Sequence, residues 1–322
     1  PCALGLAVPA VVTSASGRLF RKGLLIKHGT ALERLAEVDT VVFDKTGTLT
    51  MGTPEPVNMA DHSVQDIALA AALAAGSSHP LARALVGAAR GVVPVEVSEL
   101  REVPGYGVEA IWQGKRVRLG RADWCGATAL DITATYLARD GAAVGFGFAD
   151  RLRPGAIEAV KAIKAQGREI KLISGDVAGA VEALAKRLGI EDWTAGALPA
   201  EKAAAVAALS EAGHRVLMVG DGLNDTAALA RAHVSISPAT ALDAARVASD
   251  IVLLGQDMAP IGDALRIAGQ AKRRILQNFG ISALYNVVAV PLALAGFATP
   301  LAAALAMSLS SISVSLNALR LK

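Results

Sequence analysis

The sequence predicts an α/β protein: a doubly wound parallel sheet with a second domain inserted into it, and membrane-spanning helices at both ends. Three short apolar runs, each ending on an acidic residue, predict strands of the sheet: VDTVVFD at 38–44, REIKLISGD at 168–176 and HRVLMVGD at 214–221. Segments with helical apolar spacing lie between the first and last of these runs, as strand–helix alternation requires. Long uncharged stretches near both ends predict the membrane helices.

The composition favours a protein that is partly embedded in a membrane. Of the 322 residues, 53% are hydrophobic and only 19% are charged, and the mean hydropathy is +0.43. A net charge of +3 is too small to indicate a nucleic-acid partner. The two cysteines, Cys2 and Cys125, are too few for a disulfide framework.

The first element is an uncharged stretch, 1–17, which we expect to be the end of a membrane-spanning helix. It begins abruptly with PCALGLAVPA, as if in the middle of that helix, so we interpret the sequence as the C-terminal portion of a longer protein. Pro1 and Pro9 are expected to kink the helix and free backbone groups. Basic residues follow within 18–27 and indicate the cytoplasmic side. We assign 1–29 to this helix and its cytoplasmic extension.

The other end of the chain is predicted to be a transmembrane helix hairpin within 271–322. No charged residue lies between Arg274 and Arg320, which is room for two spans of about 20 residues. GFATP at 296–300 has the composition of a turn, so we expect one helix near 276–296 and another near 301–319. Basic residues flank the hairpin on both sides, so the roughly 250 residues between the spans are expected to be cytoplasmic.

The middle of the chain is predicted to form two domains. Residues 30–54 and 150–270 hold the predicted strands together with two helical segments, RPGAIEAVKAIKAQG and AGAVEALAKRLGI. Residues 55–149 break the alternation, because an Ala-rich helical stretch at 67–90 is followed by further strands. We interpret 55–149 as a domain inserted after the first strand of the sheet.

Acidic side chains gather where the predicted strands end, at Asp44, Asp176 and Asp221. In doubly wound sheets, ligands bind at the carboxyl ends of the strands. A carboxylate such as Asp44 can attack a phosphoryl group and form an aspartyl phosphate. Gly47 permits the turn that exposes backbone N–H groups to phosphate oxygens. One Asp at a strand end is more often a turn residue, so the interpretation depends on what accompanies it.

Three further segments supply the other groups that phosphoryl transfer needs. Ser174 and Gly175 offer a hydroxyl and an N–H at a second strand end, and Lys202 can neutralise phosphate charge. The sequence GDGLND at 220–225 offers oxygen ligands of the kind that Mg²⁺ prefers. A nucleophile, a hydroxyl, a lysine and metal carboxylates together indicate phosphoryl transfer.

With DKTGTLT at 44–50 and GDGLND at 220–225, the chain resembles the P-type ATPases, within the haloacid-dehalogenase fold, over essentially its whole length. The resemblance implies that ATP phosphorylates Asp44. It also implies which residues take part in catalysis: Asp44, Lys45, Thr46, Thr48, Ser174, Gly175, Asp176 and Lys202. The implied magnesium site consists of Asp44, Thr46, Asp221, Asn224 and Asp225. Phosphatases of this fold usually carry a second Asp where this chain has Thr46, so the aspartyl phosphate should last longer here.

The inserted domain is predicted to bind the nucleotide. SSHPLARAL contains His79-Pro80, and PGYGVEA contains Gly105 and Gly107. Each signal alone is weak, but together they resemble the heavy-metal pumps of this family, in which the His and both glycines contact ATP. The resemblance implies cofactor-binding residues that share this role: His79, Pro80, Gly105, Gly107 and Asp150. The family usually has Glu before this His, and this chain has Ser78 instead.

The predicted spans contain a set of soft and polar side chains. Cys2 resembles the Cys-Pro-Cys motif of heavy-metal pumps, and Tyr285-Asn286 in one span and Met307 and Ser311 in the other match the copper(I) subgroup. The resemblance therefore implies a transport site for Cu⁺ formed by Cys2, Tyr285, Asn286, Met307 and Ser311. Thiolate and thioether are ligands that select Cu⁺, whereas Zn²⁺ or Cd²⁺ would normally require a carboxylate, and these spans contain none.

Three alternatives remain open: a Zn²⁺ or Cd²⁺ pump, a membrane-tethered phosphatase of the same fold, and a copper-binding membrane protein without catalysis. Thr46 and the inserted domain disfavour the phosphatase, and the intact set of Asp44, Lys202 and Asp221 disfavours the third.

Two segments, HVSISPATALDAARVASDIVLL at 233–254 and TPLAAALAMSLSSISVSLNALRL at 299–321, most resemble the copper pumps that supply bacterial cytochrome oxidases. This implies a bacterial inner membrane location with most of the chain in the cytoplasm. The implied partners are membrane lipid, upstream spans and an actuator domain of the same protein, and a copper chaperone or cytochrome oxidase assembly factors.

Overall fold

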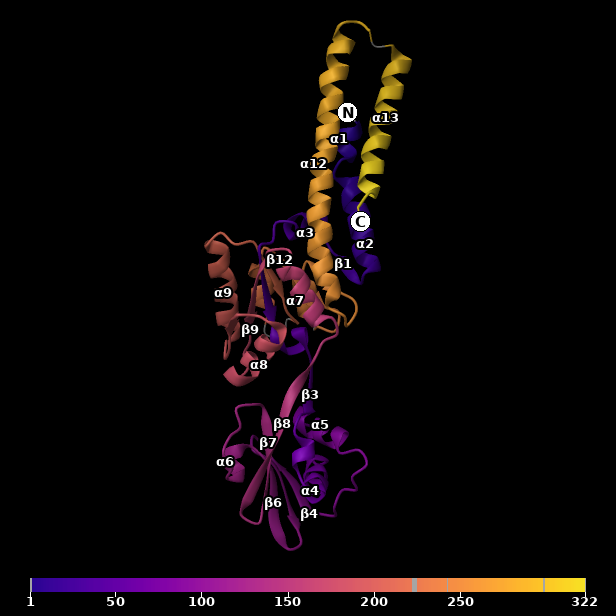
Figure 1. The fold of residues 1–322 in the computed structure, drawn as a ribbon. Coiled ribbons are helices and arrows are strands. Elements are labelled where there is room, and N and C mark those ends of the chain that lie inside the picture. Colours follow the sequence, from indigo (N-terminus) through magenta and orange to yellow (C-terminus); the bar gives the residue numbers. More distant parts are fainter. Residues whose placement is uncertain (1, 222–224, 242, 298, 322) are drawn as a thin grey trace.

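The structure, a computed structural model, describes residues 2–221, 225–241, 243–297 and 299–321, and the side chains of all of these except 2, 3, 244 and 245. The molecule is elongated, with three tiers that follow one another along its long axis (Figure 1). Long helices form one end, an α/β domain lies in the middle, and a smaller sheet domain forms the other end. This architecture confirms the predicted fold class.

The middle tier is built on a seven-stranded sheet. Its strand order is β1-β13-β12-β11-β2-β9-β10, and all neighbours are parallel except β1 and β13. The bounds of these strands are β1 Leu24–Ile26, β2 Thr40–Asp44, β9 Glu169–Ile173, β10 Asp192–Thr194, β11 Val216–Val219, β12 Val234–Pro238 and β13 Ile251–Leu253. The three runs predicted from the sequence are therefore the adjacent strands β11, β2 and β9.

Helices cover both faces of this sheet because its central strands are apolar on both sides. All five residues of β2 are buried. Val41 and Phe43 face one core and Val42 faces the other, as the two-residue period of a strand requires. The helices of this tier are α3 Gly29–Leu35, α7 Ala156–Lys164, α8 Ala178–Leu188, α9 Pro199–Glu211, α10 Thr226–Arg231 and α11 Asp243–Ala248. Helices α9 and α10 contribute to the core on the Val42 side.

The inserted domain is a six-stranded antiparallel sheet with the order β3-β8-β7-β6-β5-β4. Its elements are β3 Thr50–Pro56, η2 Met59–Asp61, α4 Val64–Ala74, α5 Pro80–Ala88, β4 Ser98–Val103, β5 Gly107–Trp112, β6 Lys115–Gly120, α6 Ala122–Cys125, β7 Ala134–Arg139 and β8 Ala142–Leu152. Its core contains Leu69, Leu73, Leu85 and Phe146. The chain enters along β3 and leaves along β8, and these two paired strands form the connection to the middle tier (Figure 1).

Four helices form the remaining tier: α1 Cys2–Leu6, α2 Pro9–Arg21, α12 Ala259–Leu294 and α13 Pro300–Leu319. Among the described helices, α12 and α13 are long and apolar enough to cross a membrane. The helix expected near 276–296 is the distal part of α12, which begins much earlier. Residues 261–271 of α12 extend the helix because their buried apolar side chains pack on the core of the middle tier, which includes α7.

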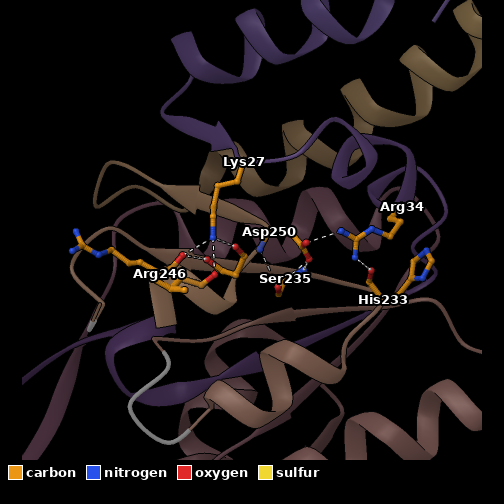
Figure 2. Close-up of polar contacts among 8 residues, drawn as sticks. Lys27, Arg34, His233, Ser235, Arg246 and Asp250 are labelled. Carbon is orange, nitrogen blue, oxygen red and sulfur yellow. Dashed lines mark hydrogen bonds and ion pairs between the residues drawn. The ribbon is translucent and has the colours of Figure 1, made fainter. Parts of the chain in front are cut away.

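A network of hydrogen bonds and ion pairs connects the segment that follows α2 to the edge of the sheet (Figure 2). Strand β1 pairs with β13, and Lys27 follows it directly. The Lys27 ammonium donates to the carbonyl oxygens of Arg246 and Val247, both at 2.8 Å, and of Ser249 at 2.6 Å. A cation is favourable beside the free carbonyls at the end of a helix such as α11.

Arg34 makes the second set of polar contacts in this network (Figure 2). Its guanidinium donates to Asp250 Oδ1 at 2.6 Å and to the carbonyl of His233 at 2.7 Å. The other carboxylate oxygen of Asp250 accepts from the N–H and the hydroxyl of Ser235, at 3.0 and 3.1 Å. These bonds tie α3 to β12 and to the residue before β13, so the chain leaving α2 is anchored to the sheet domain.

We predict that Arg34→Ala destabilises the middle tier by about 1–3 kcal/mol, because it leaves a largely buried carboxylate with fewer donors. The matched control is Lys115→Ala, which breaks an exposed ion pair with Asp140 and should change the free energy of unfolding by about 0–1 kcal/mol. Thermal unfolding of both variants measures the difference. Equal shifts of the Tm would contradict a special role for Arg34.

Candidate active site

Asp44 lies at the carboxyl end of β2, in the centre of the sheet. Because β9 and β11 are parallel to β2 on its two sides, the segments that follow them converge on Asp44. A cavity of about 430 Å³ opens there. Its lining includes most of the predicted catalytic residues: Asp44, Thr46, Ser174, Gly175, Asp176 and Lys202. Two predicted magnesium ligands, Asp221 and Asp225, line it as well. Thr48, also expected in this set, is fully buried and is not among the residues that line the cavity.

Lys202 is the buried cation of this site. It lies in the first turn of α9, and its side chain is 6% exposed. Its ammonium forms ion pairs with Asp44 and, at 2.9 Å, with Asp225. Burial opposes its charge, but the two carboxylates outweigh that effect and raise the pKa of Lys202. The lysine therefore stays charged at neutral pH.

The electrostatics of Asp44 are dominated by burial. Removal from water raises the pKa of Asp44 to about 7, and the nearby charges of Asp225 and Asp221 act in the same direction. Lys202 works against them without cancelling them. Three carboxylates thus lie together, and the Lys202 ammonium pairs with two of them, Asp44 and Asp225.

The carboxylates of Asp44, Asp221 and Asp225 could hold a metal ion. One oxygen from each lies within 4.8 Å of the others. Asp225 Oδ2 is buried without a hydrogen-bond partner among the described residues. A set of hard oxygen ligands fits Mg²⁺. Asn224, the other residue predicted at this site, lies outside the described residues.

A residue that the sequence reasoning missed, Arg153, holds the loop after Asp44. It is 3% exposed, and it donates from Nε to the carbonyl of Thr48 at 2.9 Å and from Nη2 to that of Gly47 at 2.6 Å. Gly47 has φ +72°, and a Cβ there would lie 2.1 Å from an oxygen of Asp221. The loop can therefore approach the carboxylates only with glycine at position 47. A charged residue directly before a proline, at the end of β8, is the sequence signal that could have identified Arg153.

Lys45 links the sheet domain to the connection that carries the inserted domain. Its ammonium pairs with Asp150 on β8 at 2.7 Å and with Asp176 after β9. Burial disfavours the charge, but these two partners outweigh it and raise the pKa of Lys45. Asp150, predicted to contact the cofactor, is thus a partner of Lys45 in this structure.

The predicted nucleotide residues of the inserted domain also gather. A cavity of about 290 Å³ is lined by His79, Gly105 and Gly107, together with Ser77 and Glu102. His79 precedes α5, and its Nδ1 accepts a hydrogen bond from the N–H of Leu81 at 3.3 Å. Pro80 lines a neighbouring cleft of about 340 Å³, between the inserted domain and the middle tier.

Shared residues join these three cavities. Leu81 lines both the cavity of the inserted domain and the cleft. Thr46 and Asp176 line both the cleft and the cavity at Asp44. The three cavities therefore adjoin one another in the order from His79, through the cleft, to the Asp44 carboxylate.

The residues predicted to bind Cu⁺ lie on the membrane-type helices. Tyr285 and Asn286 are half-buried on α12, and on α13 Ser311 is half-buried and Met307 is 44% exposed. No hydrogen bond between described residues joins them, and the side chain of Cys2 lies outside the description. Their role as one site stays a prediction.

We predict that the charge of Asp44 makes the stability of the ligand-free protein fall as the pH rises. The folded state retains the proton of Asp44 up to about pH 7, whereas the unfolded state releases it near its ordinary value of 3.8. Between these values the folded state binds more protons, so stability decreases with increasing pH. Asp44→Asn should flatten this decrease, and Mg²⁺ should reduce it in the wild type by binding the ionised cluster.

Thermal unfolding at pH 5 and pH 8, with EDTA or with Mg²⁺, measures this effect. The exposed Asp140→Asn is the matched control and should retain the wild-type pH dependence. A steeper decrease for Asp44→Asn than for the wild type would contradict the assignment.

We predict that Gly107→Ala disrupts the cavity of the inserted domain. Gly107 has φ +148°, and a Cβ would lie 2.2 Å from the carbonyl oxygen of Leu119, which is backbone and cannot move aside. The control Gly105→Ala has φ +80° but open space around its Cβ, so it should cost only about 1–2 kcal/mol of backbone strain. Unfolding of the inserted domain and ATP binding by calorimetry should both be affected more by Gly107→Ala.

The comparisons with known proteins agree with this site. The family model for haloacid dehalogenase-like hydrolases matches residues 38–233, which is more than half of the chain. Nitrogen fixation protein FixI of Rhizobium meliloti is 45% identical over 326 residues, covering 100% of this chain and 43% of FixI. The probable copper-exporting P-type ATPase V of Mycobacterium tuberculosis is 38% identical and is covered to 45%. The chain thus spans less than half the length of these relatives.

Solved structures give the same result. A zinc-transporting PIB-type ATPase in its E2.Pi state matches 100% of this chain with a TM-score of 0.89 at 32% identity, and 56% of that protein is covered. The catalytic domain of the CPx-ATPase CopB-B matches 78% of this chain and 98% of its own length, with a TM-score of 0.66 at 32% identity. Taken with the geometry at Asp44, these similarities show that the chain belongs to the haloacid dehalogenase-like hydrolase family and, within it, to the heavy-metal P-type ATPases.

Proposed function

We propose that the protein of which this chain is a part uses ATP to export Cu⁺ across a membrane through an aspartyl phosphate on Asp44. The observation that carries the proposal is the series of adjoining cavities from His79 to Asp44. A nucleoside triphosphate has the elongated shape that such a path requires. Its polar phosphates would lie toward Lys45 and Lys202, and its base would lie in the inserted domain.

The chemistry proposed for the site is in-line phosphoryl transfer. An oxygen of ionised Asp44 attacks the γ-phosphorus of ATP, the bond from that phosphorus to the bridging oxygen breaks, and ADP leaves with the bonding electrons. Lys202, the Ser174 hydroxyl and the Gly175 N–H, which belong to residues that line the cavity, would stabilise the negative oxygens. Mg²⁺, held by Asp44, Asp221 and Asp225, would neutralise phosphate charge and bring Asp44 into its ionised form.

The lifetime of the aspartyl phosphate follows from the residue at position 46. Thr46 lines the same cavity as Asp44, but an alcohol is not a general base near pH 7. Water is therefore not activated by this side chain, and the phosphoenzyme should persist. A long-lived intermediate favours a pump over a phosphatase of the same fold.

Copper(I) is the ion that the side chains favour. Met307 supplies a thioether, Cys2 supplies a thiol, and the distal part of α12 and all of α13 lack acidic residues. Soft ligands without carboxylates suit a monovalent soft cation. A relative from Mycobacterium tuberculosis and one from Staphylococcus aureus carry copper export in their names. The structural likeness to a zinc-transporting ATPase makes Zn²⁺ the second candidate.

The proposed location follows from the two ends of the molecule. The distal part of α12 and all of α13 would lie in a bacterial inner membrane, together with the end of the helix formed by α1 and α2. The two sheet domains would lie in the cytoplasm. The actuator domain and the other spans would come from the rest of the protein. Delivery of copper to cytochrome oxidase assembly factors, or from a chaperone, is part of this proposal.

Labelling of the full-length protein tests the phosphoryl transfer. With γ-labelled ATP and Mg²⁺, the wild type should acquire acid-stable label that hydroxylamine removes, and EDTA should prevent it. Asp44→Asn should acquire none while still binding ATP. Label that persists in Asp44→Asn would refute the assignment of the nucleophile.

Metal stimulation of ATP hydrolysis tests the ion. Met307→Leu keeps the volume and removes the sulfur, so it should lower Cu⁺-stimulated activity by about tenfold or more, since even residues that only support a metal ligand change affinity or activity by about 10–100-fold. Met258→Leu makes the same chemical change in the buried residue before α12 and should leave the stimulation unchanged. Stronger stimulation of the wild type by Zn²⁺ than by Cu⁺ would show that the copper assignment is wrong.

A further inference from the structure

A buried hydrogen-bond chain crosses the membrane-type helices where the N-terminal helix is interrupted. Helix α1 ends at Leu6 and α2 begins at Pro9, with Ala7 and Val8 between them. Proline lacks an N–H, and its ring obstructs the carbonyl four residues earlier, which accounts for the interruption. Ala7 is 0% exposed, and no backbone N–H of the described residues donates to its carbonyl.

Asn278 of α12 supplies the missing donor. Its Nδ2 lies 3.2 Å from the Ala7 carbonyl oxygen, and its Oδ1 accepts from Nδ2 of Asn317 on α13 at 2.8 Å. Arg274 donates to Asn317 Oδ1 at 3.3 Å and to the carbonyl of Arg320 at 3.4 Å. Each group donates to the next, so the bonds polarise one another from Arg274 to the Ala7 carbonyl.

This series of hydrogen bonds is buried, so it is more than a surface contact. Asn278 is 0% exposed and Asn317 is 8% exposed. In an apolar environment an unbonded amide or carbonyl is costly, so these groups are retained where they serve a purpose. Ser313, also on α13, bonds to the carbonyl of Leu309 within its own helix, as hydroxyls in helices commonly do. Asn278 instead reaches a different segment, at a buried carbonyl in the interruption of the N-terminal helix.

We propose that Asn278 is a positioning residue for the ion site. By holding the Ala7 carbonyl, it fixes the direction in which α1 leaves the interruption, and thereby the place of Cys2. The inference rests on the proposed function, because Cys2 is a ligand only if the protein carries Cu⁺. Asn317 orients the Asn278 amide. The Asn317 Nδ2 donates a hydrogen bond to the Asn278 side-chain oxygen, so the Asn278 side-chain nitrogen is directed toward the Ala7 carbonyl.

A small tilt of α1 at Ala7 is enough to displace Cys2. Helix α1 has five residues, and Cys2 is the first of them. At a rise of 1.5 Å per residue, a tilt of about 15° at Ala7 would move Cys2 by roughly 2 Å, whereas metal–ligand distances vary by only about 0.2 Å. Loss of the Asn278 bond should therefore weaken ion binding, while the phosphoryl chemistry in the sheet domain is left intact.

The test compares Asn278→Leu with the wild type in the full-length protein. Leucine has a similar volume but neither donates nor accepts. The Cu⁺ concentration that gives half-maximal ATP hydrolysis should rise about tenfold, equivalent to about 1.4 kcal/mol, and the KM for ATP should change by less than about twofold. Protection of Cys2 from alkylation by added Cu⁺, followed by mass spectrometry, should require a similarly higher Cu⁺ concentration.

Further variants separate positioning from general stability. Asn317→Leu should shift the Cu⁺ requirement in the same direction, and the double variant Asn278→Leu/Asn317→Leu should add little beyond the single change, because both residues act through one bond. Ser313→Ala should behave as the wild type. If Asn278→Leu does not fold, Asn317→Leu alone carries the test.

The outcomes distinguish this inference from the proposed function. If the wild type shows neither Cu⁺ stimulation nor Cu⁺ protection of Cys2, the proposed function fails and the inference with it. If the wild type shows both and the variants keep the wild-type Cu⁺ requirement, the inference alone is overturned. Equal effects of Asn278→Leu on the Cu⁺ requirement and on the KM for ATP would indicate a structural role only, and would also overturn it.

Discussion

Three carboxylates held together at one edge of the sheet, two of them paired with a buried ammonium, are the constraint on which the rest of the structure depends. The parallel sheet brings Asp44 and Asp221 together at the ends of adjacent strands, and Asp225 joins them. Lys202 offsets part of the negative charge by pairing with Asp44 and Asp225. The contacts around it keep this unfavourable arrangement in place: Arg153 holds the backbone of the neighbouring loop, and the sheet is packed on both faces.

Much of the fold and of the site could be predicted from the sequence because the signals were local. An apolar run that ends on an acidic residue marks both a buried strand and the edge where it terminates, and parallel pairing then brings Asp44, Ser174 and Asp221 to one cavity. The predicted strands β2, β9 and β11 are adjacent for this reason. The start of α12 could not be found from the absence of charge, because the residues before 275 carry charges on one face and pack on the sheet domain with the other.

The residues that could not be predicted act through partners distant in the sequence. Arg153 holds carbonyl groups more than 100 residues away, and Asn278 bonds to Ala7 across more than 270 residues. Neither has a local pattern that specifies its partner. Lys45 is similar: its position in DKTGTLT was recognised, but its pairing with Asp150 depends on how β8 returns to the sheet domain. Thr48 is the opposite case. It lies inside the DKTGTLT motif, but its side chain is buried within the protein rather than exposed to the cavity.

The paired strands that carry the inserted domain have a consequence for its evolution and engineering. Thr50 and Leu152 are opposite one another in the β3–β8 ladder, so the chain leaves and re-enters the sheet domain at neighbouring points. A short turn that joined these two residues would close the gap as an ordinary hairpin, without a change of register in the seven-stranded sheet. The middle tier is thus a complete fold into which about 100 residues have been placed, and such a module can be exchanged between scaffolds as one unit.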